Sequence, residues 1–195
     1  KVCEGMGMTA MYNTHITGLS VQEDPARGGS LEKAVTTVHT DRGDVHADLV
    51  VAALGTYTPK FLAPYTRLPI PIYPVRGYAV FFPITPESQA QKEVLQGGTI
   101  HYSRGFGVHR FDDVIRVSGL AELRGWDNSI KSEAWVIDLF RQRLKAFCGW
   151  DLDRLAGGTQ NIKAWCGLRP VTPDNLPILG RIPNYRNLYI CSGHS

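Results

Sequence analysis

The feature that most constrains the fold is the stretch 72–84, in which two unlike sets of residues alternate along the chain. Successive side chains of a β-strand point to opposite faces, so this alternation predicts one long strand with two different faces. A strand of this kind belongs in an antiparallel sheet. The first face carries Arg76, Tyr78, Val80 and Phe82, and the second carries Val75, Gly77, Ala79 and Phe81.

More antiparallel structure is expected further along the chain. Segments 106–111 and 114–119 are predicted to form a hairpin, because Asp112 and Asp113 between them suit a tight turn. Apolar residues recur at helical spacing over 132–147, which predicts a helix packed on the sheet, with Ser132 as its N-cap.

Two further strands are predicted near the end of the chain. A short strand at 165–168 is expected to lead into a rigid, proline-rich loop that begins at Arg169, and a last buried strand covers 187–191.

A different pattern occurs in the first third of the chain. The continuous apolar run 47–54 ends at Gly55 and predicts a buried, parallel strand, whose carboxyl end is where an α/β sheet presents a ligand site. Segments 9–21 and 31–40 are expected to be strands on either side of a loop at 23–30. The fold class predicted from these patterns is therefore mixed, α/β or α+β.

The composition excludes several classes of protein. With 195 residues and 43% hydrophobic content, the chain has enough material for one domain or slightly more. The 21 basic and 18 acidic residues are scattered, which argues against a nucleic-acid partner, and no apolar run approaches the roughly 20 residues of a membrane span. The four cysteines are far apart, which favours reduced, buried thiols in an intracellular protein. The chain starts at Lys1, so any targeting segment is expected to have been removed or to lie outside this sequence.

Known motifs give little direct information on chemistry. Residues 5–10 match GxGxxA, but too few residues precede them for the strand that a dinucleotide-binding turn requires. The sequence contains no HExxH, CxxC, GxSxG or P-loop motif, and its histidines lack metal-ligand spacing.

Arg169 is the residue with the clearest chemical potential. A guanidinium held between prolines suits a bidentate grip on a carboxylate. On residue chemistry alone, an ion pair with Asp174 or a contact with a helix C-terminus is favoured over that role. Gly55 as an ordinary turn and His194 as a partner of the backbone are likewise favoured when each residue is considered alone.

The chain as a whole resembles the C-terminal half of the D-amino-acid oxidase superfamily, and within it most resembles the small subunit of the D-amino-acid dehydrogenases. Five blocks occur in the same order: VVAALGTYTPKFL at 50–62, PIYPVRGYAV at 71–80, RFDDVIRVSGLAELRGW at 110–126, WCGLRPVTPDNLPILGR at 165–181 and NLYICSGHS at 187–195. The resemblance implies an FAD-binding, Rossmann-like domain together with a substrate domain built on an antiparallel sheet. Residues 1–66 would be the last strands of the first domain, 67–158 the substrate domain, and 159–195 a truncated return to the FAD domain.

The resemblance also implies roles for individual residues. Arg169 matches the arginine of the GLRP motif, which binds the substrate carboxylate in that family, and this reverses the preference for an ion pair. Tyr102 is a looser match to a tyrosine of the substrate pocket. The residues expected to contact FAD are Ile16, Ala53, Gly55, Thr56, Arg76, Gly77, Gly193 and His194.

The implied activity is oxidative deamination of D-amino acids to 2-oxo acids and ammonia, with hydride transfer to the flavin and a quinone or similar electron acceptor. The alternatives are a glycine or sarcosine type of amine oxidase and a non-catalytic, β-rich binding module. Two departures matter: the glycine-rich nucleotide fingerprint is not in this sequence, and Ser195 stands where the GHG turn has its second glycine. The chain alone is therefore expected to bind FAD poorly and to be inactive. The resemblance does not separate a cytoplasmic, a peripheral membrane and a mitochondrial protein.

Overall fold

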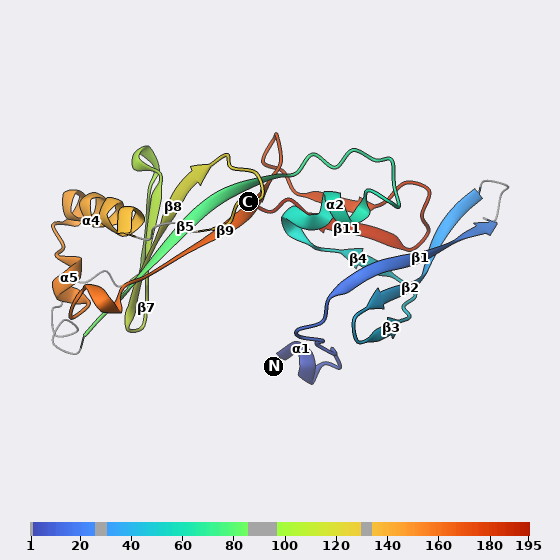
Figure 1. Ribbon diagram of the computed structural model, residues 1–195, viewed down its shortest axis with the longest axis horizontal. Helices are drawn as coiled ribbons and strands as arrows, with labels where there is room; N and C mark the ends of the chain where they lie inside the picture. Colours follow the sequence, from blue (N-terminus) through green and yellow to red (C-terminus); the bar gives the residue numbers. More distant parts are fainter. Residues whose placement is uncertain (1, 26–30, 86–96, 130–133) are drawn as a thin grey trace. The chain divides into compact units, whose positions relative to one another are not determined.

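The computed structural model of the chain describes residues 2–25, 31–85, 97–129 and 134–195 (Figure 1). The chain divides into two compact units, one made of Lys1–Ile72 and Thr172–Ser195 and the other of Tyr73–Val171. The sequence-based boundaries at 66/67 and 158/159 differ from this division. The larger difference arises because the strand at 163–171 pairs along its whole length with the strand at 73–83 and thus belongs to the second unit.

The first unit contains an antiparallel sheet of three strands in the order β1-β2-β3. The strands are β1 (Ile16–Pro25), β2 (Leu31–Thr40) and β3 (Gly43–Val45), and a short helix, α1 (Val2–Gly5), precedes them. β1 starts later than the predicted position 9, because Asn13 has a left-handed φ of 52° that no extended strand accommodates. Of the loop predicted at 23–30, residues 26–30 lie outside the described residues.

A second sheet of the first unit has the strand order β10-β11-β4. It comprises β4 (Val50–Ala52), β10 (Ile178–Arg181) and β11 (Leu188–Ser192). β4 and β11 run parallel, which confirms the predicted parallel strand, although β4 is much shorter than 47–54. The turn η1 (Gly55–Tyr57) and the helix α2 (Thr58–Leu62) follow β4.

The second sheet of the first unit has two unequal faces. Leu188 and Ile190 of β11 are buried at 0% and 4% exposure and pack in a core with Leu62. Val51 and Leu179 on the other face are 50% and 61% exposed. The predicted burial of the parallel strand therefore holds for one of its faces within the described residues.

The second unit is built on an antiparallel sheet of five strands in the order β6-β7-β8-β5-β9. The long strand predicted at 72–84 is β5, and the predicted hairpin is β7 and β8, with Asp112 in the turn at a φ of 44°. The strands are β5 (Tyr73–Pro83), β6 (Gly98–His101), β7 (Phe106–Phe111), β8 (Val114–Glu122) and β9 (Lys163–Val171), and the turn η2 (Tyr102–Arg104) joins β6 to β7.

The prediction of a rigid loop beginning at Arg169 is wrong. β9 continues to Val171, and Arg169 lies in the strand opposite Val75 of β5. Pro170 is compatible with this strand because β9 is at the edge of the sheet, where a missing N–H breaks no inner ladder.

One face of the five-stranded sheet is covered by the helix α4 (Ala134–Cys148), as Figure 1 shows. Val136, Phe140 and Leu144 of α4 are fully buried against the sheet residues Val80 and Phe82. The predicted helix is thus confirmed, while Ser132, its expected cap, lies outside the described residues. The helix α5 (Leu152–Leu155) and the turn η3 (Thr159–Asn161) lead from α4 to β9.

The opposite face of this sheet has a different composition and is called the open face below. Strand register and alternation assign to it small residues and a few large polar or aromatic ones. Its central members are Gly77, Ala79, Arg116, Ser118, Trp165, Gly167 and Arg169.

Candidate functional site

Arg169 lies on the open face with its guanidinium laid across Gly77 of the neighbouring strand. A Cβ atom built on Gly77 would lie 2.5 Å from both Cζ and Nη2 of Arg169, so only glycine leaves room for this position. Nη1 of Arg169 donates a hydrogen bond of 2.8 Å to the backbone carbonyl of Leu120 on β8. The side chain is therefore held from two strands.

A β-bulge creates the carbonyl position that Arg169 uses. The register between β5 and β8 shifts between the pairs Arg76↔Glu122 and Tyr78↔Gly119. Leu120 lies in this bulge with a φ of 65°, which is unusual for a residue with a Cβ atom. Bulges of this kind re-aim groups near functional sites. Here the bulge brings a strand carbonyl to the guanidinium.

The charge of Arg169 is not neutralised by a carboxylate among the described residues. Burial lowers the pKa of Arg169, and the charge of Arg116 lowers it further. Asp174, the partner favoured on residue chemistry alone, instead accepts a hydrogen bond of 3.1 Å from the amide of Leu176. Part of the guanidinium is thus available to an external anion.

Other large side chains of the same face also lie over glycines. A Cβ atom on Gly167 would overlap the ring of Trp165, and one on Gly98 would overlap the ring of His109. Glycines at these strand positions allow bulky groups to lie flat on the sheet. The surface of the open face is therefore formed by backbone and small residues, and a few large side chains lie flat on it in fixed positions.

Arg76, one of the predicted cofactor residues, lies on the helix-covered side and is 3% exposed. Its Nε and Nη2 atoms lie 2.9 and 2.8 Å from Oε2 of Glu122, and its Nη1 donates to the carbonyl of Ser129 at 2.8 Å. Tyr78 donates to the same Glu122 oxygen at 2.7 Å. Burial and this hydrogen bond raise the pKa of Tyr78 to about 12. The Arg76 side chain therefore ties β5 to the chain after β8, and its cofactor role stays a prediction.

In the first unit, the structure brings together most of the predicted cofactor residues. Ala53, Gly55 and Thr56 follow β4, and Gly193 and His194 follow β11, so they lie at the carboxyl ends of two adjacent parallel strands. The two ends are linked by Ser192, whose Oγ donates to the carbonyl of Gly55 at 2.9 Å and accepts from Thr58 at 3.0 Å. Carboxyl ends of parallel strands are where α/β sheets bind ligands.

The turns at these strand ends suit a cofactor that approaches the backbone closely. Gly55 and Gly193 have φ values of 55° and 86°, a region that favours glycine. A Cβ atom on Gly193 would lie 2.8 Å from Cγ2 of Thr172, so the turn has no room for a side chain. Ala53 and His194 are exposed, whereas Thr56 is buried.

Two predicted site residues stand apart from these groups. Ile16 is 37% exposed at the start of β1, opposite Thr40, in the other sheet of the first unit. Tyr102 is 85% exposed in the turn η2. That turn is adjacent to the bulge, because the amide of Leu120 donates to the carbonyl of Gly105 at 3.4 Å. Tyr102 is thus on the segment next to the Arg169 acceptor, with its side chain in solvent.

Arg116 and the carbonyl of Leu120 are two groups of the open face that the sequence interpretation missed. Arg116 lies between the buried residues Ile115 and Val117, so the alternation along β8 indicates that it faces away from the core. The bulge at Leu120 could not be predicted from the sequence in this way, because leucine rarely adopts a positive φ.

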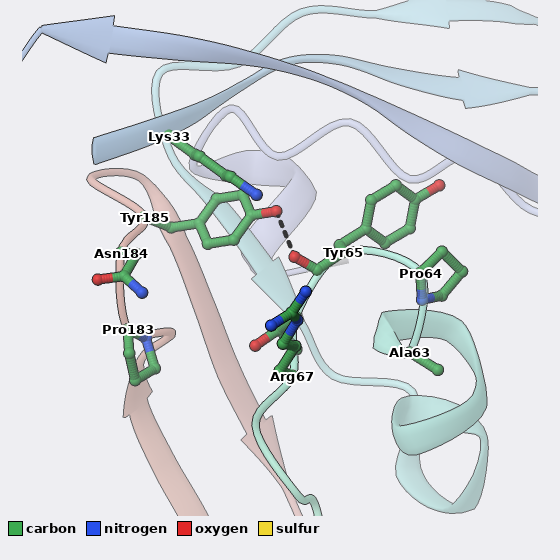
Figure 2. A pocket seen from close by; sticks show the side chains of 9 residues that line it. Lys33, Ala63, Pro64, Tyr65, Arg67, Pro183, Asn184 and Tyr185 are labelled. Carbon is green, nitrogen blue, oxygen red and sulfur yellow. Dashed lines mark hydrogen bonds between the residues drawn. The ribbon is translucent and has the colours of Figure 1, made fainter. Parts of the chain in front are cut away.

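The first unit also contains a surface pocket of about 490 Å³, which Figure 2 shows. The hydroxyl of Tyr185 donates to the carbonyl of Tyr65 at 2.7 Å within it. The pocket contains none of the residues predicted to bind substrate or cofactor. It is lined by Lys33, Ala63, Pro64, Tyr65, Thr66, Arg67, Pro183, Asn184 and Tyr185.

The described part of the chain offers no other obvious site type. None of its helices has the length and apolar character needed to cross a membrane. Over the same residues, no group of three or more histidine, cysteine or acidic side chains is arranged to hold a metal ion. The four cysteines are unbridged, and Cys3 is exposed, contrary to the expectation of buried thiols.

A family model and individual relatives both match this chain over its whole length. Residues 1–195 match the family described as FAD dependent oxidoreductase (DAO). The chain is 34% identical over 194 residues to a D-amino acid dehydrogenase of Vibrio vulnificus (strain YJ016), covering 100% of this chain and 41% of that protein. A D-amino acid dehydrogenase of Agrobacterium fabrum gives the same identity and coverage. The chain therefore spans about two fifths of the length of these relatives.

Solved structures resemble the chain in fold. Glycine oxidase from Geobacillus kaustophilus superposes with a TM-score of 0.68 at 23% identity, covering 93% of this chain and 42% of that one. L-proline dehydrogenase from P. horikoshii superposes with a TM-score of 0.62 at 20% identity, covering 93% and 44%. At these identities the likeness concerns the fold alone.

Proposed function

The chain belongs to the DAO family of FAD-dependent oxidoreductases, and we propose that it supplies the substrate-carboxylate site of an enzyme that oxidatively deaminates D-amino acids. The proposal also draws on the similarity to D-amino acid dehydrogenases over the whole chain. The complete enzyme would include the residues that those relatives have beyond this chain.

The observation that carries the proposal is the position of Arg169. Its guanidinium is held over Gly77 and by the Leu120 carbonyl, and it has no carboxylate partner among the described residues. Arginine binds carboxylates bidentately, and a fixed guanidinium loses little entropy when it does so. An amino acid held by its α-carboxylate has its Cα–H in a defined direction, and this positioning is the main task of the protein in such chemistry.

The cofactor residues of this chain would be the strand-end turns of the first unit. Gly55 and Gly193 would let FAD approach the backbone, with Ala53, Thr56 and His194 beside it and Ile16 toward the adenine. Gly77 and Arg76 are proposed as contributors from β5. FAD, when bound, supplies the acceptor for the hydride that leaves Cα of the substrate.

The proposed reaction balances without a further protein group. The lone pair of the neutral substrate amine forms a C=N bond as the hydride leaves Cα, which gives a protonated imino acid. Water then hydrolyses this imino acid to a 2-oxo acid, and the proton leaves with the nitrogen as ammonium. Arg169 holds the carboxylate throughout, with Tyr102 as a candidate second residue of the pocket, and no side-chain base is required. The electrons are proposed to pass to a quinone or a similar acceptor.

The first experiment uses the complete protein, purified with its flavin and made anaerobic. Bleaching of the flavin absorbance by D-alanine supports the proposal. Bleaching by sarcosine or glycine but not by D-alanine would instead identify an amine oxidase of the glycine or sarcosine type. A protein without flavin would exclude both and leave a binding module. Sustained hydrogen peroxide production in air would contradict the proposed quinone-type acceptor.

A further inference from the structure

A second arginine occupies the same face as Arg169. Arg116 of β8 pairs with Phe81 of β5 on one side and with His109 of β7 on the other. Its neighbours Ile115 and Val117 are fully buried on the helix-covered side. Because side chains alternate along a strand, Arg116 faces the open side.

Arg116 has no counter-charge within the part of the chain that the structure describes. Its Nε atom is buried without a hydrogen-bond partner, and no carboxylate among the described residues forms an ion pair with it. A buried, unsatisfied N–H is costly, and leaving one at a charged group is more so. Arg169 also lacks an ion pair within the described residues. The two like charges are close enough that Arg116 lowers the pKa of Arg169, although burial is the larger cause.

The space between the two guanidiniums is bordered by small residues. Ser118 separates Arg116 from the bulge along β8, and it pairs with Ala79 of β5. Gly77, over which Arg169 lies, is the next residue of β5 on the same face. An anion placed over these residues would meet positive charge from two sides and little steric obstruction.

We propose that Arg116 is a second carboxylate-binding residue, which shares the substrate's α-carboxylate with Arg169. This inference rests on the proposed function of Arg169. One carboxylate has enough acceptor sites for donors from two guanidiniums. A shared anion relieves the repulsion between the two arginines.

The test measures binding rather than turnover, on the complete flavin-containing protein. Benzoate, a simple carboxylate, is titrated against its neutral analogue benzamide, and the dissociation constants are read from the shift of the flavin spectrum. For Arg116→Met, the dissociation constant of benzoate is expected to rise about tenfold or more, while that of benzamide changes less than about twofold. Arg116→Lys keeps the charge but loses the planar fork of donors. Its dissociation constant for benzoate is expected to lie between those of the wild type and Arg116→Met.

Arg110→Met is the matched control. Arg110 is on the adjacent strand β7 and pairs with the core residue Ile115, so this variant removes one guanidinium from the same hairpin without changing the open face. Its benzoate affinity should equal that of the wild type. Arg116→Gln replaces Arg116→Met if the latter loses its flavin.

An unchanged benzoate affinity in both Arg116→Met and Arg116→Gln would overturn the inference. If the same variants selectively lose affinity for D-glutamate relative to D-glutamine, that result would place Arg116 against the substrate's side chain instead. The titration does not require oxidation of a D-amino acid. A protein that fails to oxidise D-amino acids but binds benzoate through both arginines therefore contradicts the proposed function and leaves this inference intact.

Discussion

At the scale of single residues, the open face depends on glycines as much as on its charged groups. Gly77 is the most informative, because its missing side chain is what allows the Arg169 guanidinium to lie against β5. Residue chemistry singled out Arg169 as a candidate, and family resemblance of the motif around 165–181 changed the favoured role from an ion pair to carboxylate binding. Nothing in the sequence linked Arg169 to Gly77, since the two are joined by strand pairing over a long separation in the chain.

Gly77→Ala is therefore expected to act on substrate binding. The added methyl group would displace the guanidinium from its position and weaken its bond to Leu120, so the KM for D-alanine should rise about tenfold while the protein stays folded. Steady-state kinetics of the complete enzyme provide the measurement. Gly97→Ala is the control, because a Cβ atom at Gly97 meets nothing within 4 Å. Equal KM values for the two variants would contradict this role for Gly77.

Glu122 offers a test of stability with a defined pH dependence. The hydrogen bond from Tyr78, followed by the bond and charge of Arg76, lowers the pKa of Glu122, against the opposing effect of burial. A lowered pKa in the folded state means that this carboxylate stabilises the fold above the unfolded value of about 4.3. The contribution is lost as the pH falls through the folded pKa.

Glu122→Gln should accordingly lower the free energy of unfolding by about 2 kcal/mol at pH 7, because it removes the nearer of the two carboxylates that pair with the buried Arg76 and leaves only Asp127, at 3.3 Å. The difference from the wild type should shrink as the pH is lowered below about 4. Urea denaturation across this pH range is the measurement. A difference that is constant with pH would exclude the ion pair as its cause.

At the scale of elements, alternation and turn chemistry predicted most of the second unit. Local sequence patterns predicted the strands at 73–83 and 106–111 and the turn at Asp112, because each of these elements depends on residues that are neighbours in sequence. The extension of β9 through Arg169 could not be predicted from the local sequence. A strand that contains Arg169 and Pro170 forms only because it pairs with β5. Long-range pairing overrode the local preference for a proline-rich loop.

A buried amide side chain helps to join the two sheets of the first unit, in addition to the backbone hydrogen bonds of Lys33 with Asn184 and Arg186. Asn187 is 6% exposed, and its side chain accepts from the amide of Val35 at 2.9 Å and donates to the carbonyl of Val35 at 2.8 Å. This contact links β2 to the start of β11. The sequence analysis predicted Asn187 only as the beginning of a strand, because a side chain that bonds like a neighbouring strand has no local sequence pattern.

Replacing Asn187 tests that link. Asn187→Ala would leave both backbone groups of Val35 buried without partners and is expected to cost about 2–4 kcal/mol of stability. Asn187→Asp keeps an acceptor for the amide but faces the carbonyl with a carboxylate, so it should not restore stability. Thermal unfolding followed by circular dichroism would show the loss. A shift in melting temperature of less than about 2 °C for Asn187→Ala would contradict a bridging role.

At the scale of the whole molecule, this chain contains only some of the groups that the proposed cofactor requires. It spans 41% of the Vibrio vulnificus relative, and the glycine-rich fingerprint that cradles a pyrophosphate at a helix N-terminus is not in its sequence. What it holds is the pair of strand-end turns at Gly55 and Gly193. Family resemblance predicted these turns, and the pairing of β4 with β11 places them side by side.

The 195-residue chain by itself is therefore expected to show no saturable FAD binding below about 1 mM, since affinity from two turns alone would be weak. Quenching of FAD fluorescence in a titration with the chain measures this directly, and circular dichroism of the same sample checks that the chain is folded. A micromolar dissociation constant that Gly193→Val abolishes would show instead that the strand-end turns suffice to hold the cofactor. That result would make the open face with Arg169 and Arg116 part of a flavin-binding unit in its own right, so carboxylate binding could then be tested on this chain alone.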